Sequence, residues 1–93
     1  MTYHINQAIV RWRIVDDEAV LINIENTFYY SLNKTGTLIW QLLLERPRPF
    51  AEIVGAVATR FRRTETEVSA DVRQFLEQMG AENLLTMTGA SAE

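Results

Sequence analysis

The side chains that could catalyse a reaction or bind a metal are few and scattered along the chain. His4 is the sole histidine, and cysteine is absent. A zinc site takes three or four His, Cys or acidic ligands at defined spacings, and no such group occurs. Asp16, Asp17 and Glu18 could pair carboxylates for acid–base chemistry, but they lie in a predicted turn, where no water-poor cleft holds them. The sequence therefore predicts no metal and no acid–base pair.

The serines also lack the partners that a nucleophile needs. Ser31, Ser69 and Ser91 have no histidine in the chain except the distant His4. There is no GxSxG motif and no glycine-rich phosphate loop, and the chain has only four glycines. Because a serine nucleophile requires an adjacent base, we expect no catalytic residue, no cofactor and a protein that is not an enzyme.

Composition indicates one small folded domain. The chain has 93 residues, 47% of them hydrophobic, and a net charge of -3. This charge argues mildly against a nucleic-acid partner. Neither a signal peptide nor an apolar run of about 20 residues is present. We expect a single cytoplasmic domain over 1–93, with an ordered core over about 8–86 and a flexible tail over about 87–93.

Three short segments predict an antiparallel β-meander. Apolar and cationic residues alternate over 10–14, which is typical of a half-buried strand. The segment 19–25 is rich in β-branched residues, with Val20, Ile22 and Ile24 on one face. The third strand covers 28–32. Short polar connections at 16–18 and 26–27 place the three strands side by side in chain order.

Three amphipathic helices are predicted after the strands. The first covers about 34–45 with Asn33 as its N-cap, and the prolines at 47 and 49 end it. The second covers about 50–61. Thr64 and Glu67 have the spacing of a capping box, which begins a third helix that reaches about residue 79 or beyond. The fold class expected is α+β, a three-stranded meander followed by three helices.

The aromatic segment from Phe28 to Leu32 is the most informative part of the chain. In a three-stranded meander the first and third strands are both edges. Arg11 and Arg13 guard the first, whereas the third has no charge from Phe28 to Asn33. Such an edge can accept a peptide as an additional strand. The alternative, which the sequence leaves open, is that Phe28 and Tyr30 simply belong to the core.

Two other kinds of protein remain alternatives. The second and third helices have the spacing of a helix-turn-helix, with the strands as a wing, so a small DNA-binding regulator is one. The region 64–83, however, contains five acidic residues and one basic residue, a net -4 that phosphates would repel. The other is an assembly domain without a peptide ligand. Five arginines near the helix ends indicate either an anionic partner or ordinary solubility: Arg46, Arg48, Arg60, Arg62 and Arg63.

Several segments together resemble the PqqD family. They are VLINIENTFYYSLNKTG from Val20 to Gly36, Ile39–Trp40, Phe50–Val54, Asp71–Val72 and Phe75–Leu76. The resemblance extends over about residues 10–85. It implies a winged-helix-like fold that recognises ribosomally made, modified peptides. It further implies that a precursor's leader peptide adds to the third strand and packs on the third helix. The peptide-binding residues would be Phe28, Tyr29, Tyr30, Ser31, Leu32, Asp71, Val72, Phe75, Leu76 and Met79.

Within the family, Tyr30–Asn33 with Thr35–Gly36 looks more like the stand-alone proteins of lasso-peptide clusters. Members from the quinone pathway more often have an acidic-glycine pair after the first helix, where this chain has Leu44–Pro47. The resemblance thus implies a separate leader peptidase as the partner enzyme, or a radical enzyme in the quinone-like case. No membrane partner is expected.

Overall fold

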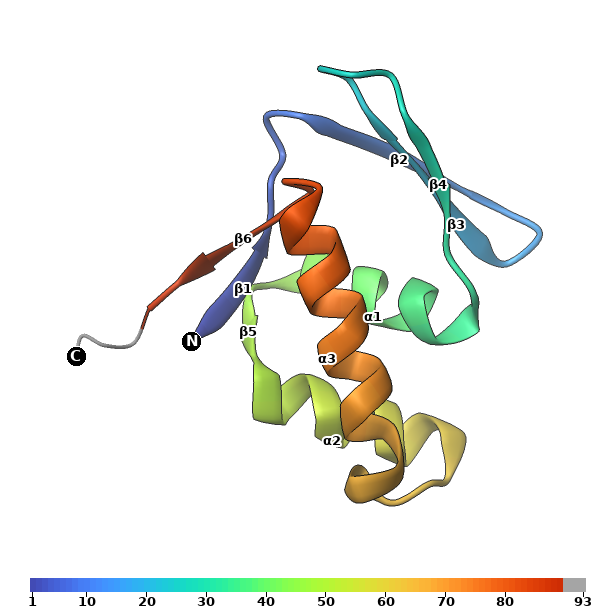
Figure 1. The fold of residues 1–93 in the computed structure, drawn as a ribbon. Coiled ribbons are helices and arrows are strands. Elements are labelled where there is room, and N and C mark those ends of the chain that lie inside the picture. Colours follow the sequence, from blue (N-terminus) through green and yellow to red (C-terminus); the bar gives the residue numbers. More distant parts are fainter. Residues whose placement is uncertain (90–93) are drawn as a thin grey trace.

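The computed structural model describes residues 1–89, which form a three-stranded meander, three helices and a second small sheet (Figure 1). The predicted α+β fold, with the meander before the helices, is confirmed. The elements are β1 (Thr2–Ile5), β2 (Val10–Val15), β3 (Glu18–Asn23), β4 (Tyr29–Ser31), α1 (Lys34–Glu45), β5 (Arg48–Pro49), α2 (Phe50–Phe61), α3 (Glu65–Ala81) and β6 (Leu85–Thr88).

The meander has the strand order β2-β3-β4, so β2 and β4 are its edges. Asp16 and Asp17 join β2 to β3 with φ angles of 52° and 67°. Two positive φ values in a two-residue loop match the right-handed twist of the paired strands. Leu21 lies opposite Trp12 on one side and Tyr30 on the other.

The face of β3 that packs on the helices is not the β-branched one. Ala19 and Leu21 are fully buried, whereas Val20 and Ile22 are only half-buried on the opposite face. The Ala19 N–H donates to Thr37 Oγ1 of α1 at 2.9 Å, which holds this face against the helix. β-Branched residues fit a pleated surface whether or not helices cover it, so their presence did not identify the buried face.

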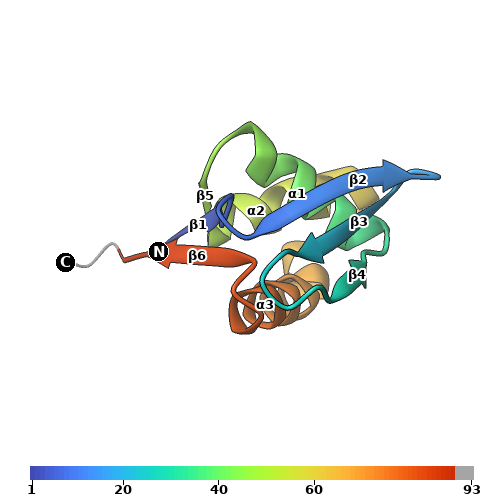
Figure 2. The ribbon, with the colours of Figure 1, turned by 90° about the horizontal axis from the view of Figure 1, so that it is seen from above.

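A second sheet joins the two ends of the chain, with the order β5-β1-β6. Thr2 lies opposite Thr88, and Ile5 lies opposite Leu85. In Figures 1 and 2 this sheet lies at the end of the molecule away from the β2–β3 turn. None of its three strands was predicted from the sequence, and residues 87–88 of β6 were expected in a flexible tail. Each strand is short, and the pairing depends on partners far apart in the chain. Residues 90–93 of the predicted tail lie outside the described residues.

The three helices begin and end close to their predicted limits. Asn33 Oδ1 accepts a hydrogen bond from the Gly36 N–H at 2.8 Å, which caps α1. The Thr64 hydroxyl accepts from the Glu67 N–H, and the Thr64 N–H donates to Glu67 Oε1, which completes the predicted capping box. α3 ends at Ala81, which agrees with the prediction that it reaches about residue 79 or beyond. No helix of residues 1–89 is long and apolar enough to span a membrane.

The core lies between the meander and the helices. Its largest fully buried side chains come from β3, from all three helices and from the segment before β6: Trp40, Leu21, Ile39, Ile53, Leu76, Leu84, Val57 and Val72. This packing holds β4 beside α3, although the two are separated by more than 30 residues of chain.

Two of the arginines left open by sequence analysis are paired within the chain. Arg48 is buried; its Nε donates to the Leu42 carbonyl at 2.9 Å, and its guanidinium pairs with Glu45 and Glu52. Arg46 also pairs with Glu52, and these contacts lower the pKa of the Glu52 carboxyl. This arginine cluster joins the end of α1 to the start of α2.

Candidate binding groove

The edge strand β4 has backbone groups that point away from the sheet. The Asn23 N–H donates to the Phe28 carbonyl at 3.0 Å, and the Leu32 N–H donates to the Ala19 carbonyl at 2.8 Å. Hydrogen-bonded and non-hydrogen-bonded pairs alternate in an antiparallel ladder. The backbone N–H and C=O groups of Tyr30 therefore face β3. Those of Tyr29 and Ser31 point to the open edge of the sheet.

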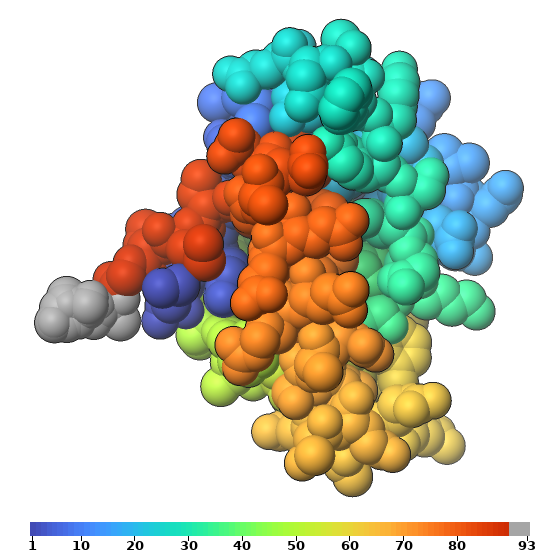
Figure 3. All heavy atoms as spheres, in the orientation of Figure 1, coloured from blue at the N-terminus to red at the C-terminus, as the bar shows by residue number. Residues whose placement is uncertain are grey.

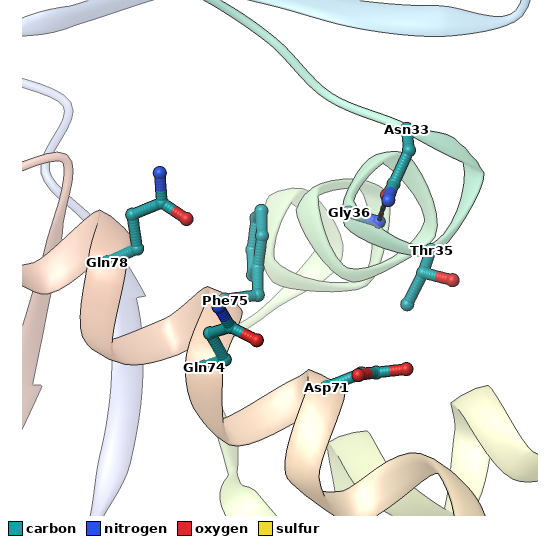
Figure 4. Close-up of a pocket in the computed structure, with 7 residues that line it drawn as sticks. All are labelled: Asn33, Thr35, Gly36, Asp71, Gln74, Phe75 and Gln78. Carbon is teal, nitrogen blue, oxygen red and sulfur yellow. Dashed lines mark hydrogen bonds between the residues drawn. The ribbon is translucent and has the colours of Figure 1, made fainter.

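A groove follows this edge between β4 and α3. One hollow of about 230 Å³ lies between Tyr30–Asn33 and the α3 residues Phe75, Gln78 and Met79. A second, of about 320 Å³, continues along α3 to Asp71 (Figure 4). Asn33, Phe75 and Gln78 line both hollows, so the two are continuous, and together they are called the β4–α3 groove. Figure 3 shows the same face, with α3 beside the segment that runs from β4 into α1.

The two ends of the β4–α3 groove differ in chemistry. Leu32, Phe75 and Met79 supply apolar surface near β4. The other end is polar, with Thr35, Gln74 and the Asp71 carboxylate. Among the side chains drawn in Figure 4, the one hydrogen bond joins Asn33 to Gly36. The groove can thus accept both an apolar and a polar side chain.

Two contacts fix the walls of the groove. The Tyr30 hydroxyl donates to Glu82 Oε1 at 2.7 Å, which ties β4 to the end of α3 and raises the pKa of the Tyr30 phenol. At the other wall, a Cβ added to Gly36 would lie 2.9 Å from Phe75 Cε1. Glycine at position 36 therefore lets the Phe75 ring lie directly on the first turn of α1.

The structure brings together six of the ten residues that the resemblance implied. The groove is lined by Tyr30, Ser31, Leu32, Asp71, Phe75 and Met79. Tyr29 contributes its outward backbone, while its side chain is 70% exposed on the outer face. Phe28 is 60% exposed outside the groove, and its N–H already donates to Asn26 Oδ1.

Val72 and Leu76 do not line the groove, which corrects the sequence-based assignment. They are 0% and 1% exposed and belong to the core. One residue along a helix turns the side chain by about 100°, so neighbours such as Phe75 and Leu76 face different surroundings. The apolar arc expected on α3 was too broad to separate core from groove.

Several lining residues were not predicted from the sequence: Asn33, Thr35, Gly36, Gln74 and Gln78. Asp71, Gln74, Phe75 and Gln78 have the spacing i, i+3, i+4, i+7, which places them on one side of a helix. This polar-aromatic stripe is the sequence feature that could have indicated the α3 wall of the groove. Glutamine and threonine are so common on exposed helix surfaces that the stripe does not stand out without the facing strand.

The other residues considered for chemistry lie apart from the groove. His4 Nε2 is 3.0 Å from Thr88 Oγ1 across the β1–β6 pair. Within residues 1–89 no group of three His, Cys, Asp or Glu side chains could bind a metal. The Ser69 hydroxyl donates to the Thr66 carbonyl on the same helix, and Ser91 lies outside the described residues.

Comparison with known proteins assigns the chain to a family. Residues 18–85 match the profile of the family described as "Coenzyme PQQ synthesis protein D (PqqD)". The structure is similar to that of "TbiB1 in Complex with the TbiA(beta) Leader Peptide", with a TM-score of 0.81 and 31% sequence identity. That match covers 92% of this chain and 98% of the other. No match was found among curated proteins. Since the matched family profile extends over most of the chain, this protein belongs to the PqqD family.

Proposed function

We propose that this protein binds the leader region of a ribosomally synthesised precursor peptide and delivers it to a modifying enzyme. The leader would add as a strand to β4 and place alternate side chains in the β4–α3 groove. The single observation that supports this most is the open edge of β4 beside a groove with an aromatic floor. TbiB1, which is similar over nearly its whole length, is named as a complex with a leader peptide.

In this proposal the protein is a non-catalytic cytoplasmic peptide chaperone, and the partner enzyme performs the chemistry. Asn33, Thr35 and Gly36 of the groove lie in the segment whose resemblance favours the lasso-peptide type, for which the partner is a leader peptidase. A radical enzyme would take that place in a quinone-type pathway.

Backbone pairing and side-chain burial would have different roles in binding. A backbone hydrogen bond contributes only about 0.5–1.5 kcal/mol net, because water competes for the same groups. The outward groups of Tyr29 and Ser31 would therefore set the register. Apolar contacts with the half-buried Phe75 ring would supply most of the affinity, with the buried Leu32 and Met79 supporting the groove floor beside it.

The charge of α3 argues against the DNA-binding alternative. Between Glu65 and Ala81 the helix contains four acidic residues and one basic residue. As a recognition helix it would bring a net -3 against the phosphate backbone. The assembly-domain alternative predicts instead that no peptide binds at β4, and the following experiment tests it.

Amide hydrogen exchange measured by NMR tests strand addition residue by residue. The probes are the TbiA(beta) leader peptide and peptides selected on this protein from a random display library. We expect the Tyr29 and Ser31 amides to gain protection on binding. The Tyr30 and Leu32 amides should change little, because they already pair with β3. Absence of any bound peptide, or protection that does not alternate along β4, would overturn the proposal.

A matched pair of proline variants separates the two sheet edges. The Ile24 N–H donates to the Ile9 carbonyl, so Ile14 of β2 directs its N–H outward as Ser31 does on β4. Proline removes this N–H from an edge without breaking the ladder. Ser31→Pro should weaken peptide binding, and Ile14→Pro should leave it unchanged. The opposite pattern would place the peptide on β2.

A further inference from the structure

The geometry points to Asp71 as a specificity-determining residue that selects a cationic side chain in the bound peptide. We infer that the recognised segment has Lys or Arg two residues before an apolar residue, the first facing Asp71 and the second covering Phe75. This inference rests on the proposed strand addition to β4, and it adds the chemical class of peptide that the groove takes.

The first support is that Asp71 has a charge without a partner. Its carboxylate lies at the polar end of the β4–α3 groove, on the same side of the groove as Thr35 (Figure 4). It takes part in none of the ion pairs formed among residues 1–89. Arg63 lines an adjoining hollow that Asp71 also reaches, but it forms no ion pair with Asp71.

Other acidic residues near this site are already engaged. The Glu67 carboxylate accepts from the Thr64 N–H at 2.9 Å, and Glu82 accepts from the Tyr30 hydroxyl. Glu52, in the first turn of α2 and away from the groove, is paired with two arginines. Asp71 is thus the acidic side chain in the groove that is free to meet a cation from a ligand. A charge-assisted contact of this kind strengthens once the peptide excludes water.

The second support is the match between helix and strand spacing. Asp71 and Phe75 are four residues apart, which is about 6 Å along a helix axis. Side chains on one face of a strand repeat every two residues, or about 6.6–6.8 Å. A peptide strand that lies along α3 would therefore place successive groove-facing residues over Asp71, then Phe75, then the Gln78 and Met79 region.

The third support concerns the direction of the peptide. β4 runs from Tyr30, beside Glu82 at the end of α3, toward Asn33 and Thr35, beside Asp71. Each pairing in the meander is antiparallel. A strand that continues this pattern runs the opposite way along the groove and reaches Asp71 first. The cationic residue therefore precedes the apolar one.

Selection from a random peptide display library tests the inference with three variants. Wild-type protein should enrich Lys or Arg two residues before an apolar residue. Asp71→Asn should lose this preference and bind the wild-type-selected peptides about three- to tenfold more weakly. Asp71→Lys should enrich Asp or Glu at the same position. The matched control is Glu77→Lys, which adds the same charge to an exposed position of α3 that lines none of the groove.

Three outcomes distinguish this inference from the proposed function. Selected peptides that protect Tyr29 and Ser31 but show no cationic preference would overturn the role of Asp71 and leave strand addition intact. A cationic preference that survives in Asp71→Asn, or disappears equally in Glu77→Lys, would overturn it as well. Failure to select any peptide that protects β4 would overturn both. Thermal melting of each variant checks that the exposed substitutions leave the fold unchanged.

Discussion

The two sides of α3 show how one helix is divided between stability and recognition. One side is a stripe of Val68, Val72 and Leu76, none more than 5% exposed. Met79, which is also buried, lies at the border and lines the groove near β4. The side that borders the groove has Asp71, Gln74, Phe75 and Gln78, of which Phe75 alone is apolar and half-buried. The rest of the chain buries the first stripe. The second stripe leaves polar and aromatic surface in the groove, which a ligand could cover.

The same contrast appears among the charged residues. Arg48 is buried and its guanidinium is matched by Glu45 and Glu52, so the arginine cluster presents no free charge to a partner. Asp71 lies in the groove and has no ion pair within residues 1–89. Pairing within the fold, rather than the number of charges, therefore separates structural charges from candidate binding charges.

The largest expected effect tests the buried side of α3. Leu76→Ala should lower the free energy of unfolding by about 2–5 kcal/mol, because it leaves a cavity in a close-packed core. Affinity for a selected peptide, measured on the folded fraction, should not change. Urea unfolding and peptide titration below the unfolding transition measure the two quantities separately. A fall in affinity at unchanged stability would assign Leu76 to the groove after all.

A smaller stability effect and a larger binding effect are expected one residue away. Phe75→Ala removes a half-buried ring from the groove floor, so it should cost less stability than Leu76→Ala. Peptide affinity should fall by about 1–2 kcal/mol, as for an aromatic anchor at an interface. The same two measurements, made on both variants, test the comparison. It fails if Phe75→Ala costs more stability than Leu76→Ala or leaves affinity unaltered.

The smallest expected effect concerns pH and the capping box that begins α3. Hydrogen bonds from Thr64, chiefly from its backbone N–H, hold the pKa of Glu67 below its usual value of 4.5. A carboxyl with a lowered folded-state pKa stabilises the fold above its unfolded pKa, and this contribution disappears as the pH falls through the folded value. Glu67→Gln keeps the cap without the titration. Its unfolding midpoint should therefore change less between pH 7 and pH 3 than that of the wild type, with peptide affinity at pH 7 unchanged.

Local sequence signals predicted most of the fold. The Asn33 cap, the Thr64–Glu67 capping box and the two prolines defined the helices, because such signals act within a few residues. Alternation predicted the meander and both of its edges. The sheet formed by β1, β5 and β6 was beyond this reasoning, since its strands are two to four residues long and are stabilised by partners at the other end of the chain.

For the site, the residue pattern was enough to predict that β4 is an uncharged aromatic edge and that α3 is amphipathic. Which side of α3 faces β4 depends on how the elements pack in three dimensions. Tyr29 turned out to contribute backbone and Phe75 to contribute surface, whereas Leu76 is buried. A helix places successive residues about 100° apart, so a shift of one residue exchanges core for groove. The residue pattern of α3 is compatible with either orientation of the helix. The packing of α3 against α1 and α2 allows only one.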